Sequence, residues 1–131
     1  MKILLDTHTL LWALYKSSIL PQNVINMLTS QNNTISFSIA SLWEIQIKHD
    51  KHPDKMPYKA EDVMVDALID FDILNLVPIH IFNLSNLENH HNDPFDRLLI
   101  CQAKCENMML LTADHVIAEY NNQNIITFKP L

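Results

Sequence analysis

The chain has 131 residues, 48% of them apolar, and a formal net charge of −6, which fits a single domain over residues 1–131. No apolar stretch approaches the length of a membrane span, and an acid at position 6 comes too early for a signal peptide. The acidic balance argues against tight non-specific binding to a nucleic-acid backbone, and the absence of glycine excludes the Gly-rich phosphate loops of P-loop and dinucleotide-binding proteins.

The first half of the chain alternates short apolar runs with segments of helical periodicity. The apolar runs have the length of buried strands, and the helical segments repeat apolar residues every three or four positions. In chain order, we predict a strand at 2–5, a helix at 9–15, a helix after Pro21 that fails near Asn32 and Asn33, a strand at 34–37, a helix capped by Ser38 or Ser41, and a surface loop at 49–58.

The second half continues the alternation. Its strongest signal is Asp93-Pro94, an N-cap acid followed by a proline at the first helical position. In chain order, we predict a helix at 60–71, a strand at 75–77 ended by Pro78, a short helix at 79–87, a helix from Asp93 to about Asn107, a strand at 108–112, a helix from Asp114 to Tyr120, and a strand at 125–128. Asparagine is expected to replace glycine where the helix ends at Asn107.

This alternation predicts an α/β fold. Strands that alternate with helices require right-handed crossovers and a parallel sheet that is covered on both faces. We therefore expect a single three-layer domain with a central parallel sheet of about five strands flanked by helices. Ligands bind at the C-terminal ends of the strands in such sheets.

Four carboxylates stand where a predicted strand stops or inside the first turns of a predicted helix. Asp6 and Asp114 directly follow strands, Asp96 lies in a first helical turn, and Glu44 lies one to two turns inside its helix. Acids gathered in this way repel one another unless a cation lies between them, and carboxylate oxygens are ligands for Mg²⁺ or Mn²⁺. The pattern predicts a metal site that activates water for phosphodiester cleavage.

Four blocks of sequence span nearly the whole chain: 4–12, 41–48, 90–103 and 110–114. In content and order they resemble the PIN-domain ribonucleases, specifically the VapC-type toxins of toxin–antitoxin pairs. The resemblance implies a PIN-like domain whose acidic quartet, Asp6, Glu44, Asp96 and Asp114, binds Mg²⁺ or Mn²⁺. It also implies endonucleolytic cleavage of RNA, inhibition of translation in the cytoplasm, and neutralisation by a small antitoxin whose C-terminal tail blocks the site.

The resemblance further implies a homodimer, for which the apolar helix face with Trp12, Ile19 and Leu20 is a candidate. There are two departures from the family pattern. Cys101 replaces the usual small residue, and the segment 50–53 replaces a common Gly-containing turn. Neither touches the quartet, but the second would alter substrate choice.

Several other residues are candidates for supporting roles near the acids. Asp93 is interpreted as an N-cap that holds the helix of Asp96, with direct metal binding as the alternative. Thr7 and Thr112 either bond a metal-bound water or only end their elements. Arg97 and Lys48 either contact phosphate or pair with the acids.

Other conspicuous side chains are given structural interpretations. His90 and His91 suggest a zinc site, but adjacent histidines point in different directions and no cysteine lies nearby, so a solvated loop is favoured. Cys101 and Cys105 are interpreted as reduced core thiols. Trp43 is interpreted as a core or interface aromatic.

Two functions from other classes are alternatives. A phospho-acceptor signalling domain also gathers acids at strand ends, but it needs an acceptor Asp ending a central strand, and the strand at 34–37 ends without one. A catalytically inactive PIN-like module would only sequester an antitoxin or RNA. Metal-dependent cleavage of RNA distinguishes the nuclease from both alternatives.

Overall fold

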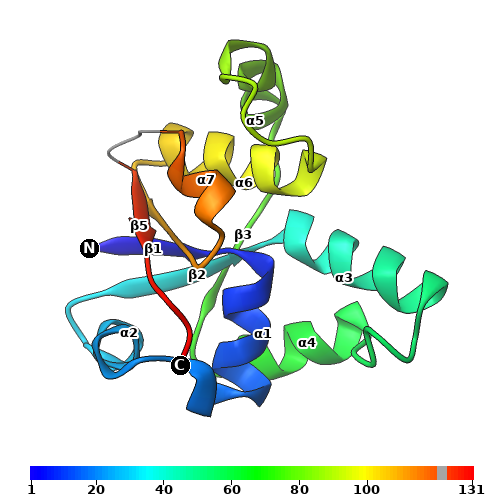
Figure 1. The fold of residues 1–131 in the computed structure, drawn as a ribbon, viewed down its shortest axis with the longest axis vertical. Helices are drawn as coiled ribbons and strands as arrows, with labels where there is room; N and C mark the ends of the chain where they lie inside the picture. Colours follow the sequence, from blue (N-terminus) through cyan, green and yellow to red (C-terminus); the bar gives the residue numbers. More distant parts are fainter. Residues whose placement is uncertain (121–123) are drawn as a thin grey trace.

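The structure is a computed structural model that describes residues 1–120 and 124–131. Five strands form one parallel sheet in the order β3-β2-β1-β4-β5 (Figure 1). The strands are β1 Lys2–Leu5, β2 Thr34–Ser38, β3 Asp72–Leu74, β4 Met109–Thr112 and β5 Ile125–Thr127. The predicted α/β class with a central parallel sheet is confirmed.

Helices cover both faces of this sheet. They are α1 Thr7–Tyr15, α2 Gln22–Thr29, α3 Ile39–Lys51, α4 Ala60–Ala67, α5 Pro78–Phe82, α6 Pro94–Cys105 and α7 His115–Ala118. In Figure 1, α1, α2 and α4 lie on one side of the sheet and α5, α6 and α7 on the other. Within the described ranges, no helix has both the length and the apolar character needed to cross a bilayer.

The central strand shows why both faces are covered. Successive side chains of a strand point to opposite faces, and every residue of β1 after the first is buried. Ile3 and Leu5 belong to the apolar cluster under α1, α2 and α4, whereas Leu4 packs with Leu99 and Ile117 on the other face. A strand buried on both faces reads as a continuous apolar run, as this one does.

The strand order positions the candidate site. From β1 the chain adds β2 and β3 on one side and then β4 and β5 on the other, so the order reverses between β1 and β4. Open α/β sheets bind ligands outside the carboxyl ends of the strands at such a reversal. Leu5 pairs with Leu111, so β1 and β4 end at the same edge, where Asp6 and Asp114 follow.

The surface loop predicted at 49–58 was wrong for its first residues. Residues 49–51 form the last turn of α3. The Gln46 amide donates to the Asp50 carboxylate at 2.9 Å across one helical turn. Lysines in the last turn, including Lys48, also interact favourably with the carbonyl end of the helix. The charge-rich composition therefore belongs to a solvated helix end.

The predictions between α4 and α6 were also displaced. The third strand is Asp72–Leu74 instead of 75–77, and the helix before it ends at Ala67. Val77 is the N-cap of α5, and the predicted helix at 79–87 divides into α5 and a 3₁₀ turn. A residue before proline favours extended backbone in either role, so its sequence does not distinguish a strand from a cap. Pairing with β2 selects the earlier segment.

The end of α6 confirms the role predicted for Asn107. This residue has a φ of 57°, the left-handed value usually taken by glycine. The Met108 N–H donates to the Ala103 carbonyl at 2.8 Å, which is the long hydrogen bond of a Schellman motif. By contrast, α7 ends at Ala118, two residues before its predicted end.

Some apolar side chains lie where the sequence did not suggest. Trp43 is 58% exposed, so it is not a core residue, and Cys105 is exposed whereas Cys101 is buried. The face suggested for self-association is largely packed, because Leu20 is buried and Trp12 is only partly exposed. A homodimer through that face is therefore not supported by its exposure.

Candidate metal centre

Asp6 is fixed at the junction of β1 and α1. Its carboxylate caps α1, with Oδ1 accepting from the Thr9 N–H at 2.9 Å, while Oδ2 accepts from the Thr112 hydroxyl at 2.6 Å. The residue is only 3% exposed. Burial raises the pKa of Asp6, although hydrogen bonds from Thr112 and Thr9 oppose the rise. Each oxygen keeps a lone pair for a further ligand.

Thr112 links Asp6 to Asp114. While its hydroxyl donates to Asp6, the same oxygen accepts from the Asp114 N–H at 2.9 Å. Asp114 then caps α7 by accepting from the Val116 N–H at 2.8 Å. Burial acts to raise the pKa of Asp114, but hydrogen bonds from His91 and Val116 outweigh it and leave the pKa below its ordinary value. One threonine therefore sets the spacing of two acids from neighbouring strands.

Asp96 carries the strongest sign of crowding among the acids. It lies in the first turn of α6, whose N-cap is Asp93, as predicted; Asp93 Oδ1 accepts from the Asp96 N–H at 3.3 Å. Burial, followed by the negative charges of Asp93, Glu44 and Asp6, raises the pKa of Asp96 to about 7. Carboxylates from three other points of the chain thus act on one side chain.

Glu44 faces inward from α3. Although it lies on a helix, the residue is only 3% exposed. Its Oε1 accepts from the Thr7 hydroxyl at 2.6 Å, and its Oε2 lies 2.5 Å from Lys48 Nζ. Burial acts to lower the pKa of Lys48, but Glu44 and then Asp93 and Asp96 outweigh it and raise the pKa. Of the two roles suggested for Lys48, the structure contains the pairing with an acid.

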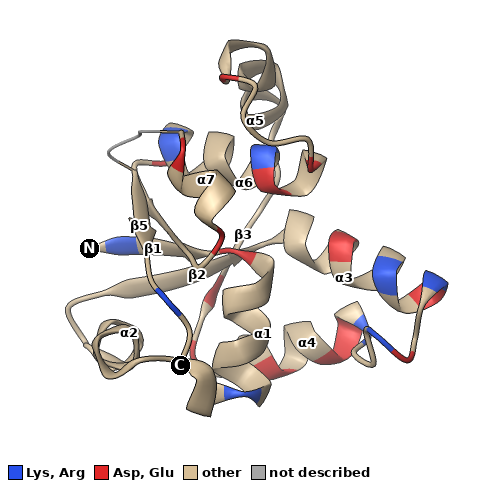
Figure 2. Cartoon of the chain, viewed as in Figure 1, with Lys and Arg blue, Asp and Glu red and all other residues tan. Residues whose placement is uncertain are grey.

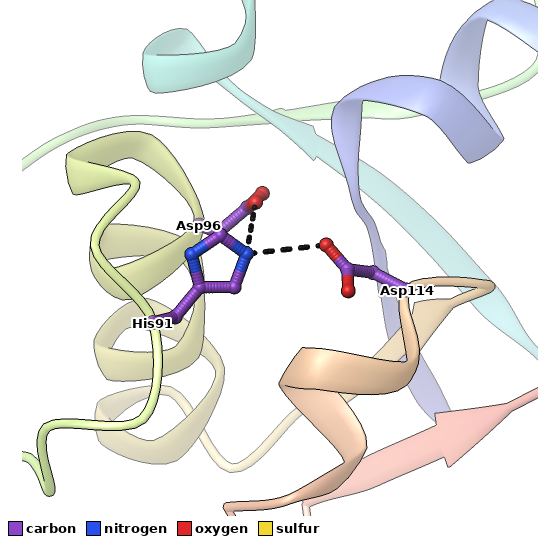
Figure 3. Close-up of side chains that lie close together, drawn as sticks. All are labelled: His91, Asp96 and Asp114. Carbon is purple, nitrogen blue, oxygen red and sulfur yellow. Dashed lines mark hydrogen bonds and ion pairs between the residues drawn. The ribbon is translucent and has the colours of Figure 1, made fainter.

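His91 was missed at the sequence level. The solvated loop favoured for the two histidines is wrong here, because the His91 side chain is only 15% exposed and lies between two acids (Figure 3). Its Nε2 lies 3.1 Å from Asp96 Oδ2 and 3.2 Å from Asp114 Oδ2. His90, in contrast, pairs with Glu88 at the surface. The available signal was the position of His91, two residues before the N-cap Asp93.

Arg97 does not join the acids. Its guanidinium donates to the backbone carbonyls of Glu88 at 3.0 Å and Leu84 at 3.3 Å, and to the Tyr120 hydroxyl at 3.3 Å. It therefore fastens the segment before α6 to the rest of the protein. Its suggested pairing with the acids is therefore not found among the described residues, and its suggested contact with phosphate stays a prediction.

The arrangement as a whole fits a hard divalent cation. Acidic residues occur at the starts of α6 and α7, inside α3 and just before α1, around the carboxyl edge of the sheet (Figure 2). Ligand atoms of His91, Asp96 and Asp114 lie within 4.8 Å of one another, the one such group of three in residues 1–120 and 124–131. Asp6 and Glu44 lie outside this tight group but act on Asp96 through their charges. Carboxylate oxygens in this number suit Mg²⁺ or Mn²⁺.

Comparison with known proteins gives a family. A family model described as the PIN domain matches residues 3–123. No curated protein matches the chain.

Solved structures share the fold. VapBC2 from Rickettsia felis, bound to a DNA fragment from its promoter, has a TM-score of 0.71 at 22% identity, with 99% of each chain covered. DNA-bound VapBC from Salmonella typhimurium has a TM-score of 0.68, and VapBC-1 from nontypeable Haemophilus influenzae one of 0.65; both are 14% identical and cover 97% of this chain and 98% of theirs. With the family model covering almost the entire length, this chain belongs to the PIN domain family.

Proposed function

We propose that this protein is a Mg²⁺- or Mn²⁺-dependent endoribonuclease whose metal ligands are Asp6, Glu44, Asp96 and Asp114. The observation that carries the proposal is the gathering of acids around Asp96 at this edge of the sheet. Oxygens of Asp96 and Asp114 both lie within 3.2 Å of His91 Nε2, and the negative charges of Asp93, Glu44 and Asp6 act on Asp96 as well. A carboxyl group that several other acids repel at the ligand-binding edge of a sheet does not stabilise the fold, so a binding role explains it better. A cation would relieve that repulsion.

The size of the repulsion supports a cation site. Two carboxylates 5 Å apart repel by about 3 kcal/mol at an effective dielectric near 20. Lys48 pairs with Glu44, while His91 Nε2 donates to Asp114 and lies 3.1 Å from an oxygen of Asp96. Further positive charge is required before all four acids can be ionised together.

The residues around the acids hold them ready for such a cation. Thr9 and Thr112 orient Asp6, while Thr7 orients Glu44. Since these partners are fixed by helix starts and a strand end, the oxygens need little rearrangement on binding. A bound divalent ion lowers the pKa of a coordinated water and so provides hydroxide near neutral pH. No nucleophilic side chain is then needed for hydrolysis.

We further propose that the protein is a toxin that acts in the cytoplasm, inhibits translation by cutting RNA, and is neutralised by a cognate antitoxin. Support comes from PIN membership together with the likeness to structures of VapBC pairs. A homodimer belongs to the same proposal. Expression of the chain alone is then expected to arrest growth, and Asp6→Ala to relieve the arrest.

A cleavage assay tests the enzymatic proposal. Labelled RNA is incubated with protein in Mg²⁺, in Mn²⁺ and in EDTA, using the parent, Asp6→Asn and Asp96→Asn. Asp70→Asn is the matched control, because Asp70 is exposed and precedes the amino end of β3, at the opposite edge of the sheet. Loss of a ligand should slow cleavage roughly 100-fold or more, equivalent to about 3 kcal/mol in the barrier.

The same assay decides between the enzyme and an inactive binding module. Cleavage in metal that EDTA abolishes and that only the control variant retains would support the enzyme. A parent protein that binds RNA or an antitoxin but cuts no RNA in either metal would favour the binding module instead.

A further inference from the structure

We propose that His91 donates a hydrogen bond from its Nε2–H to the phosphate of the RNA substrate and is not a ligand of the metal. The inference rests on the proposed nuclease function and assigns the group that draws a phosphate into an acidic site. It begins from the position of His91, whose Nε2 lies within 3.2 Å of carboxylate oxygens on both Asp96 and Asp114 (Figure 3).

The backbone of Asp93 fixes the tautomer of this imidazole. The Asp93 N–H points at His91 Nδ1 with a donor–acceptor distance of 2.9 Å. A backbone N–H can only donate, so Nδ1 is the acceptor, and in the neutral ring the proton must then be on Nε2. A protonated nitrogen has no lone pair to offer a metal. His91 Nε2 therefore lies within 3.2 Å of oxygens on two acids and carries an N–H, which donates to Asp114.

Hydrogen bonds between its backbone and the side chains of Tyr120 and Arg97 hold the segment that carries His91. The His91 N–H donates to the Tyr120 hydroxyl at 2.9 Å, and Arg97, itself bonded to the carbonyls of Leu84 and Glu88, donates to the same hydroxyl. The ring thus has a fixed position while part of its surface stays accessible. Donors held in advance lose little freedom when a ligand arrives.

The partners of the donors near the acids differ. Lys48 pairs with Glu44, and Arg97 donates to backbone carbonyls and Tyr120. The oxygens beside His91 Nε2 belong to Asp96 and Asp114, the proposed metal ligands, so a cation that binds them would compete for these oxygens and leave the N–H free for a phosphate. Phosphate oxygens are acceptors like the carboxylate oxygens that Nε2–H now contacts. A phosphate that enters among the acids therefore meets an N–H already directed into the site, and a hydrogen bond to a charged acceptor is stronger than one between neutral groups.

Binding measurements test this role without requiring turnover. The probe is a labelled random-sequence single-stranded RNA in Ca²⁺, followed by fluorescence anisotropy with the parent, His91→Ala, His91→Gln and His52→Ala. His91→Ala should weaken RNA binding roughly 10-fold or more, the loss expected for a hydrogen bond to a charged group. His91→Gln should recover part of the affinity through its amide N–H. His52→Ala is the matched control, because His52 is exposed at the C-terminal end of α3, and its affinity should stay within about twofold of that of the parent.

Metal affinity and the tautomer provide independent readouts. The affinity for Mn²⁺, from the electron paramagnetic resonance signal of the free ion, should be no weaker in His91→Ala than in the parent. The ¹⁵N spectrum of the parent's imidazole should show a proton on Nε2 both without metal and with Mg²⁺. A tenfold loss of Mn²⁺ affinity, or a proton on Nδ1, would make His91 a ligand and overturn the inference.

The outcomes separate this inference from the nuclease proposal. If the parent cleaves RNA but His91→Ala binds RNA as tightly as the parent, only the inference is wrong. If the parent cleaves nothing yet loses RNA affinity with His91→Ala, the nuclease proposal fails and the contact to RNA stands. A parent that binds no RNA overturns both.

Discussion

Replacing Asp96 with asparagine is expected to stabilise the metal-free protein at high pH while abolishing its activity. The carboxyl is 16% exposed, in the first turn of α6, and the charges of Asp93, Glu44 and Asp6 act on it. Asparagine keeps the size of the side chain and places an amide group beside His91, but it removes the charge. The repulsion disappears with the charge.

The raised pKa of Asp96 sets the size and the sign of the effect. The pKa rises from an ordinary value of 3.8 to about 7 on folding, so between these two values the folded state binds more protons than the unfolded state. The contribution of Asp96 to the free energy of unfolding is therefore fully present below the unfolded-state pKa of 3.8, and it is lost as the pH rises toward 7. Over the whole range the loss is about 4 kcal/mol, and between pH 5 and pH 8 about 3 kcal/mol.

Urea unfolding in EDTA, followed by circular dichroism from pH 5 to pH 8, measures this difference. The free energy of unfolding of Asp96→Asn relative to the parent should grow by about 3 kcal/mol across that range. For the control Asp70→Asn, the free energy of unfolding should change with pH in parallel with that of the parent. Parallel curves for Asp96→Asn as well would refute the electrostatic account of the site.

Three further predictions concern the same site and the fold around it. Mg²⁺ at 100 times its Kd should stabilise the parent by about 2.7 kcal/mol in thermal unfolding at pH 8, and Asp96→Asn by much less; equal stabilisation would place the ion elsewhere. Thr112→Val removes the link between Asp6 and Asp114, so it should lower the free energy of urea unfolding by about 1–3 kcal/mol and weaken Mn²⁺ binding, and unchanged values would contradict this role. Asn107→Ala places at a φ of 57° a residue that has a Cβ but lacks the short polar side chain of asparagine. The free energy of unfolding should fall by about 1 kcal/mol in Asn107→Ala and should not fall in Asn107→Gly. Identical melting curves for the two variants would contradict the Schellman ending.

The net charge of the chain bears on how it would bind a nucleic acid. A formal net charge of −6 gives little general attraction for RNA. For the proposed RNA substrate, the attraction would then be local and would come from a cation bound by the acids and from a donor such as His91 Nε2–H. Affinity for RNA is expected to depend more on the divalent ion than on the concentration of monovalent salt, and a filter-binding titration in both salts measures the two dependences.

Local sequence was sufficient wherever a signal depended on a few neighbouring residues. The apolar run of β1 followed at once by Asp6, and the Asp93-Pro94 start of α6, are signals of that kind. Asn107 is another, because a chain without glycine must use asparagine where a helix ends in the left-handed conformation. In each case the backbone preference acts within a few residues, so no distant contact was needed to predict the element.

Signals that depended on distant partners were misread. The position of β3 follows from its pairing with β2, and Arg97 is turned away from the acids by carbonyls of the segment before α6. Trp43 and Cys105 are exposed although both have apolar character. A short segment has the same composition whether it pairs in a sheet, caps a helix or lies exposed, so its conformation and burial depend on what packs against it.

The sequence by itself determined the order of strands and helices, and with it the places where acids leave a parallel sheet. Only the tertiary structure decided that His91 lies between Asp96 and Asp114, with its Nδ1 occupied by a backbone N–H. The physical reason is the distance along the chain over which each interaction acts. Hydrophobic periodicity and capping act between residues a turn apart, whereas the direction of an imidazole donor depends on a loop that Tyr120 and Arg97 hold from elsewhere in the chain.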